Sequence, residues 1–348
     1  MTDIRVLIAE DSPTVRWHLK TLLEEAGLRV VGMAQDGEQV VSLVQDLKPD
    51  VISMDIRMPR VDGLEATRRI MARYPTPVVI VSGMLDTEID LSLQALEAGA
   101  LAVVSKPPDR QNPEFAEKRQ QLATMLRAMA GVRVIARREF FRPFEPLLMD
   151  VPPARLPRRL TPEIVAIGAS TGGPGALHQL LQMFPASFRV PMVIVQHMPH
   201  EFIGGLVRWL SSNTPLTVQV AENGMRLLAG KVMIAPGDVH LRVERRGSDL
   251  IARLESDRGA YRHQPSVDVL FESVARTCGS AGVGVILTGM GEDGAAGLLT
   301  MRQKGAYTFA QDEASSTVFG MPGAAMIRGA VERLEPLANI APEILKLI

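Results

Sequence analysis

Short apolar runs alternate with amphipathic segments twice along this chain, and the two alternating regions flank a stretch rich in proline and arginine. Within the first 130 residues the apolar runs lie at 5–9, 29–34, 51–55, 78–82 and 101–105. Continuous Val/Ile runs are typical of strands that are buried on both faces. Strands that alternate with helices predict a parallel sheet with right-handed crossovers. The first region is therefore expected to be an α/β domain with five parallel strands.

The alternation resumes at residue 161, with apolar runs at 164–168, 191–197, 217–220, 231–235, 283–287 and 307–310. Segments 267–277 and 295–304 have helical periodicity. Two further short runs, 241–243 and 251–254, flank Arg245-Arg246-Gly247-Ser248-Asp249, which indicates a hairpin. We expect a second α/β domain, with a doubly wound parallel sheet and a small antiparallel hairpin.

The segment between the two regions, 131–160, breaks the pattern with clustered proline and arginine residues. Such a composition packs poorly and is typical of a linker. The sequence therefore predicts three parts: a domain at 1–130, a Pro/Arg-rich linker at 131–160 and a larger domain at 161–348.

The charge balance limits the classes of partner. The chain of 348 residues has 38 Lys and Arg against 39 Asp and Glu, a formal net charge of −1. This argues against a nucleic-acid binder, which carries a basic excess. A single cysteine excludes an internal disulfide, and no apolar run approaches the roughly 18 residues of a membrane span. We expect a cytoplasmic protein without direct membrane insertion.

Three acidic side chains follow strand ends in the first domain. Glu10 and Asp11 end the first predicted strand, and Asp55 ends the third. In a doubly wound sheet these two strands are neighbours near the switch point, so the carboxylates should crowd one pocket. A hard divalent cation relieves such crowding, and Mg²⁺ suits a few carboxylates with water.

Two further side chains end the remaining strands of that sheet. Lys106 follows the fifth strand, and its ammonium group can hold a phosphate as a point charge. Ser82 ends the fourth strand and offers a hydroxyl. Together with the carboxylates, these groups indicate a site for a metal ion and a phosphoryl group.

Five short motifs of the first region, taken in order, resemble the receiver domains of response regulators. They are Ala9-Glu10-Asp11-Ser12, Met54-Asp55-Ile56-Arg57-Met58-Pro59, Asp62-Gly63, Val81-Ser82 and Ser105-Lys106-Pro107. The resemblance implies a flavodoxin-like fold and phosphorylation of Asp55 by a partner histidine kinase. It also implies that Glu10, Asp11, Asp55 and the Arg57 carbonyl bind Mg²⁺, and that Ser82 and Lys106 contact the phosphoryl group. The switch position that is often aromatic in this family is Val103 here.

Three residues of the second domain each suit one part of a serine hydrolase. Ser170 lies in a Gly-x-Ser-x-Gly turn after an apolar run, His197 ends a second run, and Asp293 lies in a glycine-rich loop after a third. Sites in open parallel sheets form at the carboxyl ends of strands. A nucleophile, a base and an orienting acid placed there can converge.

Each of these residues also has a structural interpretation. Ser170 fits a capping serine in a Gly-rich turn, His197 a packed strand-end histidine, and Asp293 the cap of a helix near Ala295. The chain order Ser, His, Asp differs from the Ser, Asp, His order of α/β-hydrolases. The turn motif therefore does not assign that fold.

Five motifs of the second domain resemble the protein-glutamate methylesterases of bacterial chemotaxis, the CheB family. They are Gly168-Ala169-Ser170-Thr171-Gly172-Gly173-Pro174, Gln196-His197-Met198-Pro199, Ile234-Ala235-Pro236-Gly237-Asp238, Pro265-Ser266-Val267-Asp268 and Leu287-Thr288-Gly289-Met290-Gly291-Glu292-Asp293-Gly294. With the receiver motifs in front, the resemblance covers nearly the whole chain apart from the linker.

This resemblance implies hydrolysis of glutamate γ-methyl esters on the cytoplasmic helices of chemoreceptors. Ser170 would attack the ester, His197 would transfer the proton, and Asp293 would orient the imidazole. The Met290 N–H would help to bind the oxyanion, with Thr171 supporting the site and no metal needed for hydrolysis. Many relatives also deamidate receptor glutamines.

A complete switch joined to a complete triad suggests regulation. We hypothesise that the unphosphorylated receiver covers the strand-end face that carries Ser170, and that phosphorylation of Asp55 opens it. Two other functions stay open: a phospho-dependent adaptor that keeps the esterase fold, and a hydrolase of another ester or amide in a non-motility sensory pathway. A DNA-binding regulator is disfavoured because no helix-turn-helix signature is present.

Overall fold

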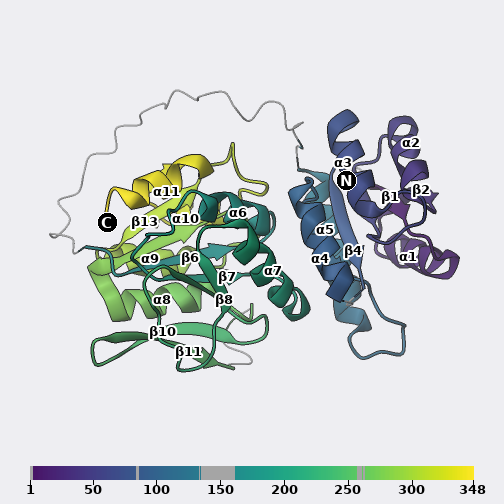
Figure 1. Cartoon of the computed structure of the whole chain (residues 1–348). Helices are drawn as coiled ribbons and strands as arrows, with labels where there is room; N and C mark the ends of the chain where they lie inside the picture. The colour runs from purple at the N-terminus through teal and green to yellow at the C-terminus, as the bar shows by residue number, and fades with distance from the viewer. Residues whose placement is uncertain (1–2, 84–85, 133, 135–160, 257–260, 262) are drawn as a thin grey trace. The chain divides into compact units, whose positions relative to one another are not determined.

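The computed structural model describes residues 3–83, 86–132, 134, 161–256, 261 and 263–348 (Figure 1). The chain divides into two compact units, Met1–Met149 and Asp150–Ile348, each of which is described by itself. Most of the predicted linker, 131–160, lies outside the described residues. Within the described parts of the chain, no helix is long and apolar enough to cross a membrane.

The first unit has a five-stranded parallel sheet in the order β2-β1-β3-β4-β5, which confirms the predicted fold. Its strands are β1 (Arg5–Ala9), β2 (Arg29–Ala34), β3 (Val51–Met54), β4 (Val78–Ser82) and β5 (Ala102–Ser105). Its helices are α1 (Pro13–Glu25), α2 (Gly37–Leu47), α3 (Gly63–Arg73), α4 (Asp86–Glu97) and α5 (Phe115–Ala130). Strands β1 and β3 are neighbours, as the acidic pocket requires.

Polar caps begin three of these helices. The side chains of Ser12, Asp36 and Asp62 accept backbone N–H bonds at the starts of α1, α2 and α3. Such caps satisfy donors that a helix start leaves unpaired. Gly63 follows at the first position of α3, where a Cβ atom would lie 2.2 Å from the Asp55 carbonyl oxygen. The helix start therefore lies directly against the segment after β3.

The second unit has a seven-stranded parallel sheet in the order β14-β13-β12-β6-β7-β9-β8. The strands are β6 (Ile164–Ala169), β7 (Met192–Gln196), β8 (Thr217–Val220), β9 (Lys231–Ile234), β12 (Gly282–Ile286), β13 (Tyr307–Gln311) and β14 (Arg333–Glu335). The helices are α6 (Gly173–Gln182), α7 (His200–Asn213), α8 (Val267–Cys278), α9 (Ala295–Gln303), α10 (Met321–Ile327) and α11 (Leu337–Leu345). The predicted doubly wound sheet is confirmed, and the strand missing from the sequence prediction is β14, which has only three residues.

The antiparallel hairpin is formed by β10 (His240–Arg246) and β11 (Asp249–Glu255), as predicted. The turn passes through Gly247, whose φ of +61° favours glycine. The hairpin packs on α8: the Ser273 hydroxyl accepts the Val243 N–H, and the Thr277 hydroxyl donates to the Val243 carbonyl. Helix α8 thus lies between the hairpin and the sheet (Figure 1).

Strand β6 lies at the centre of the sheet, where the strand order reverses. From β6 the chain passes to β7, β9 and β8 on one side, and later to β12, β13 and β14 on the other. Binding sites in open α/β sheets form at the carboxyl ends of strands beside such a reversal. The loops after β6, β7 and β12 therefore meet at the expected position.

Close packing of α8 on β6 depends on a glycine. A Cβ atom at Gly168 would lie 2.2 Å from the Val267 Cγ1 atom, at the first turn of α8. We expect Gly168→Ala to lower the free energy of unfolding by about 1–3 kcal/mol, because overpacking displaces the helix start. Thermal and denaturant unfolding measure the change.

The matched control is Gly175→Ala in α6, where a Cβ atom would meet nothing within 4 Å. Alanine is also the better helix former, so this variant should be at least as stable as wild type. Equal stability of the two variants would contradict the packing argument.

Candidate functional site

Two of the three predicted site residues lie side by side at the ends of β6 and β7. The last pair in the register joins Ala169 to Gln196, so Ser170 and His197 follow at the same level of the sheet. The His197 N–H donates to the Ala169 carbonyl at 2.9 Å, and the Ser170 N–H donates to the Thr288 carbonyl at 3.1 Å. Strand pairing on both sides of β6 therefore fixes the backbone at Ser170.

Asp293 reaches the same place from the loop after β12. Its Oδ2 atom lies 2.8 Å from the His197 Nε2 atom, and the two side chains are 8 % and 13 % exposed. A carboxylate only accepts, so the hydrogen bond places the imidazole proton on Nε2. The other ring nitrogen, Nδ1, is left as the basic atom for a neighbouring hydroxyl.

The start of α8 holds the Asp293 carboxylate in place. The Ser266 hydroxyl donates to Oδ1 at 2.8 Å, the Val267 N–H to Oδ2 at 2.8 Å, and the Asp268 N–H to Oδ1 at 3.1 Å. Ser266 is also the N-cap of α8, where backbone donors and the helix dipole favour negative charge. The N-terminus of α8 therefore binds the Asp293 carboxylate in the way that helix N-termini bind anions.

The surroundings set the charge of Asp293. Burial alone would raise the pKa of its carboxyl, but the hydrogen bond and charge of His197, with donors from Val267 and Ser266, hold that pKa well below its usual range. Asp293 is thus ionised at neutral pH. An ionised Asp293 can stabilise an imidazolium at His197.

A second carboxyl, Asp268, lies beside the first. Burial is the main cause that raises the pKa of Asp268 to about 6, and the Asp293 charge adds to it, although the Gly297 N–H opposes the shift. That N–H donates to Asp268 Oδ1 at 2.7 Å from the first turn of α9. Of the two neighbouring carboxyls, Asp293 keeps the negative charge and Asp268 takes up a proton more readily.

The capping interpretations of Ser170 and Asp293 are wrong. The N-cap of α6 is Gly172 and the N-cap of α9 is Gly294, and neither helix start has a side-chain cap. Asp293 instead accepts a hydrogen bond from the Val267 N–H at the start of α8, 26 residues earlier in the chain. Among the described residues, the Ser170 hydroxyl has no hydrogen-bond partner, which leaves it available for chemistry.

The two remaining predicted residues, Thr171 and Met290, lie close to Ser170. Thr171 is buried, and its carbonyl accepts the Thr288 hydroxyl at 2.9 Å. Met290 follows Gly289, where a Cβ atom would lie 2.8 Å from the Ser170 Cβ atom. Within the described part of the chain, the Met290 N–H donates no hydrogen bond, so it is available as a donor near Ser170.

Three residues near the triad were not assigned a role from the sequence. Ser266 binds Asp293, and its N–H donates to Nδ1 of the buried His240 at 3.2 Å. His263 stacks on His197, with ring centroids 4.6 Å apart and an angle of 22° between the planes. The motif Pro265-Ser266-Val267-Asp268 was a usable signal for Ser266, whereas neither histidine lies in a pattern that indicates its contact.

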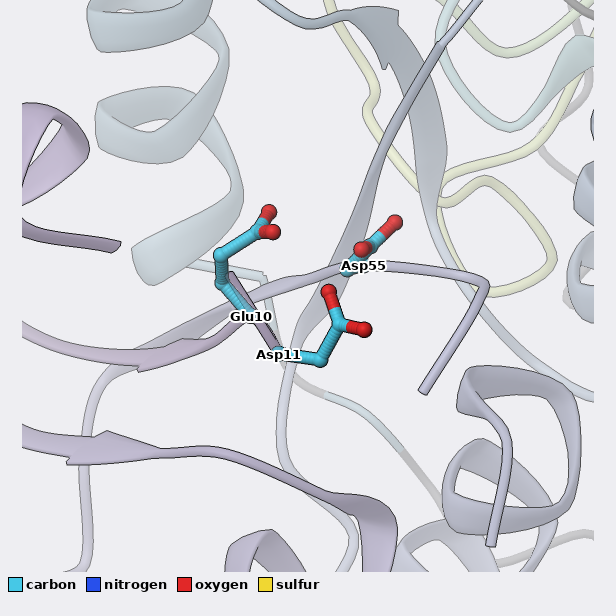
Figure 2. A group of neighbouring side chains, drawn as sticks. All are labelled: Glu10, Asp11 and Asp55. Atoms are coloured by element: carbon cyan, nitrogen blue, oxygen red, sulfur yellow. The ribbon is translucent and has the colours of Figure 1, made fainter. Parts of the chain in front are cut away.

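The first unit brings its three predicted carboxylates together. Figure 2 shows Glu10 and Asp11 after β1 and Asp55 after β3, gathered at the strand ends. One oxygen from each lies within 4.8 Å of the others. An all-carboxylate donor set at this spacing matches the ligands that Mg²⁺ prefers.

Lys106 bridges two of these carboxylates. Its Nζ atom lies 3.0 Å from Glu10 Oε2 and 2.9 Å from Asp55 Oδ2. Burial raises the pKa of both carboxyls, and Lys106 only partly offsets the effect. Burial alone would lower the pKa of Lys106, but the pairs with Asp55 and Glu10 raise it. The pocket therefore favours additional positive charge.

Ser82 and Arg57 complete the predicted set around Asp55. Ser82 is fully buried at the end of β4, and its carbonyl accepts the Lys106 N–H at 2.9 Å. The Arg57 N–H lies 3.4 Å from Asp55 Oδ1, a long contact that keeps the loop close to the carboxylate. The residues predicted for this unit thus gather around Asp55.

Comparison with known families assigns both units. Residues 6–113 match the response regulator receiver domain, and residues 165–344 match the CheB methylesterase. A protein of Myxococcus xanthus (strain DK1622) named protein-glutamate methylesterase/protein-glutamine glutaminase 4 is 45% identical over 97% of this chain and 95% of its own. A protein of Nitrosospira multiformis with the same two activities in its name is 40% identical over 99% and 97%.

A solved structure agrees with these matches. The catalytic domain of the Thermotoga maritima CheB methylesterase superposes with a TM-score of 0.53 and 35% identity, covering 54% of this chain and 100% of that domain. The fold is thus a receiver followed by a methylesterase-type sheet domain. The chain belongs to the CheB methylesterase family.

The raised pKa of Asp268 predicts a pH-dependent stability. An unfolded aspartate has a pKa of about 3.9, whereas that of folded Asp268 is about 6. Folding therefore favours the protonated form, and stability is lost as the pH rises through the window between these values. We expect Asp268→Asn to raise the melting temperature above pH 6, with the difference shrinking towards pH 4. Unfolding curves at several pH values measure it.

The control for this effect is Glu222→Gln, which removes an exposed carboxyl in the same unit. It should leave the pH dependence as in wild type. An Asp268→Asn gain that is the same at pH 4 and pH 8 would contradict the assignment of the proton to Asp268.

Proposed function

We propose that this protein hydrolyses glutamate γ-methyl esters on chemoreceptor proteins and that phosphorylation of its receiver regulates the reaction. The observation that carries the proposal is the 2.8 Å bond between His197 and Asp293, formed beside Ser170 at adjacent strand ends. Nucleophile, base and orienting acid are the parts that ester hydrolysis requires. The names of the relatives supply the substrate class.

In the first half of the reaction, the Ser170 Oγ atom attacks the ester carbonyl carbon. His197 accepts the serine proton at Nδ1, and the ionised Asp293 stabilises the imidazolium that forms. The Met290 N–H and the donors at the start of α6 stabilise the oxyanion. His197 then gives the proton to the methoxy oxygen as the carbon–oxygen bond breaks, so that methanol leaves and a glutamyl ester of Ser170 remains.

In the second half, water replaces methanol. His197 takes a proton from the water as its oxygen attacks the acyl carbon, and returns the proton to Ser170 when that ester breaks. The products are a receptor glutamate and free enzyme. A receptor glutamine would pass through the same acyl-enzyme with ammonia as the leaving group, which accounts for the glutaminase activity in the relatives' names.

The receiver supplies the regulation. Asp55 accepts the phosphoryl group from a histidine kinase, and Lys106 and Ser82 contact its oxygens. Glu10, Asp11, Asp55 and the Arg57 carbonyl would hold Mg²⁺, which neutralises charge between the carboxylates and the incoming phosphoryl group. The 2.9 Å Lys106–Asp55 pair supports this assignment, because the ammonium group already lies at the phosphorylation site.

Two substitutions separate hydrolysis from regulation. We expect Ser170→Ala to lower methanol release from methylated chemoreceptor membranes by at least about 10³-fold, because no nucleophile remains. Asp55→Asn should keep the basal rate and lose the increase that a small phosphodonor with Mg²⁺ produces. Methanol release is measured with and without the phosphodonor, and receiver phosphorylation is measured separately.

Each variant serves as the control for the other, since Ser170→Ala should still be phosphorylated and Asp55→Asn should still hydrolyse. Methanol release that survives Ser170→Ala would contradict the nucleophile. If the folded wild-type protein takes up phosphate but releases no methanol, a phospho-dependent adaptor or another substrate becomes the better account.

A further inference from the structure

The last residue of β7 has a side chain that joins the nucleophile and the base. Gln196 is 1 % exposed, and its amide Nε2 atom lies 2.9 Å from the Ser170 carbonyl and 2.9 Å from the His197 carbonyl. Both accepting groups are carbonyls, so the amide must present its NH₂ group to them. One side chain thus donates to the backbone of both residues.

This bridge lies where the regular strand pairing ends. The final ladder bond between β6 and β7 is from the His197 N–H to the Ala169 carbonyl. Beyond it the two chains separate, one into α6 and the other towards α7. The Gln196 amide links the next residue after each strand, Ser170 after β6 and His197 after β7. The Ser170 carbonyl also accepts the Gly173 N–H at 2.8 Å, so its peptide plane is fixed from two directions.

The other end of the amide is unsatisfied. The Gln196 Oε1 atom is buried and has no hydrogen-bond partner among the described residues. It faces the start of α6, where a Cβ atom at Gly173 would lie 2.1 Å away. Buried polar atoms in native proteins nearly always have partners. If this position only had to fill space, an apolar side chain of this size would be more favourable than an amide. The amide is needed because it supplies the two N–H donors.

We propose that Gln196 is a positioning residue that fixes the backbone of Ser170 and His197 relative to each other by bridging their carbonyl groups. It contacts no reacting atom and acts only through the backbone of those two residues. This inference rests on the proposed esterase function. It predicts that loss of the NH₂ donors lowers the rate of the chemical step and leaves substrate affinity and the fold largely unchanged.

The first test compares Gln196→Met, which has similar volume and no donor, with wild type. We expect kcat for methanol release to fall by about 10- to 100-fold, since small misplacement of reacting groups costs rates of this order. KM should stay within about 2-fold of wild type. Circular dichroism and a melting curve give the folded fraction, to which the rates are normalised.

The second test uses Gln196→Glu, which keeps the shape and adds a titratable group. An ionised carboxylate has no donor, but a protonated carboxyl has one O–H that can reach a carbonyl. The ratio of kcat for Gln196→Glu to kcat for Gln196→Met should therefore rise as the pH falls. Gln196→Met gives the rate without a donor at each pH, and a purely structural role would leave the ratio flat.

The matched control is Gln219→Met on the edge strand β8. Among the residues that the structure describes, the amide of Gln219 donates only to the sulfur atoms of Met225 and Met233, at 3.2 and 3.1 Å. This variant should keep the wild-type kcat. If the wild-type protein releases methanol and both folded Gln196 variants keep its kcat, the proposed role of Gln196 is wrong and the proposed esterase function stands. A wild-type protein that releases no methanol would overturn the proposed function and the bridge with it.

Discussion

The candidate active site depends on the binding of one carboxylate by the start of one helix. Two N–H groups of α8 and the Ser266 hydroxyl donate to Asp293, and His197 supplies the remaining bond. These donors hold the pKa of Asp293 low in spite of its burial. A fixed, ionised Asp293 in turn determines which nitrogen of His197 carries the proton. The ring is therefore oriented before any substrate binds, which is the preorganisation that catalysis requires.

Three glycines let α8 come close enough to do this. A Cβ atom at Gly168 or Gly294 would lie 2.2 or 2.5 Å from the Val267 side chain, and one at Gly297 would lie 2.7 Å from the Asp268 carbonyl. The helix start is thus held between β6, the loop after β12 and the first turn of α9. The same close contacts that pack α8 against the core therefore also position its N–H groups to bind Asp293.

Much of this arrangement can be predicted from the sequence, for physical reasons. The strands of both sheets, apart from β14, follow from the apolar periodicity, and the pairing of β1 with β3 follows from the doubly wound fold. Ser170, His197 and Asp293 follow from their positions after strands. The bond from Ser266 to Asp293 and the raised pKa of Asp268 join segments distant in sequence, so no local pattern specifies them. The two hydrogen bonds that Gln196 donates could not be predicted either, because a glutamine at the end of a strand can bond to many different groups.

The most direct test is the protonation state of His197 in the full chain. Nitrogen NMR of histidine-labelled protein, with His197→Gln to assign the signal, reports which ring nitrogen carries the proton when the imidazole is neutral. We expect a proton on Nε2, bound to Asp293, and an unprotonated Nδ1 that can accept the Ser170 proton. A proton on Nδ1 in the folded protein would contradict it, since Nε2 would then turn a lone pair towards an ionised carboxylate.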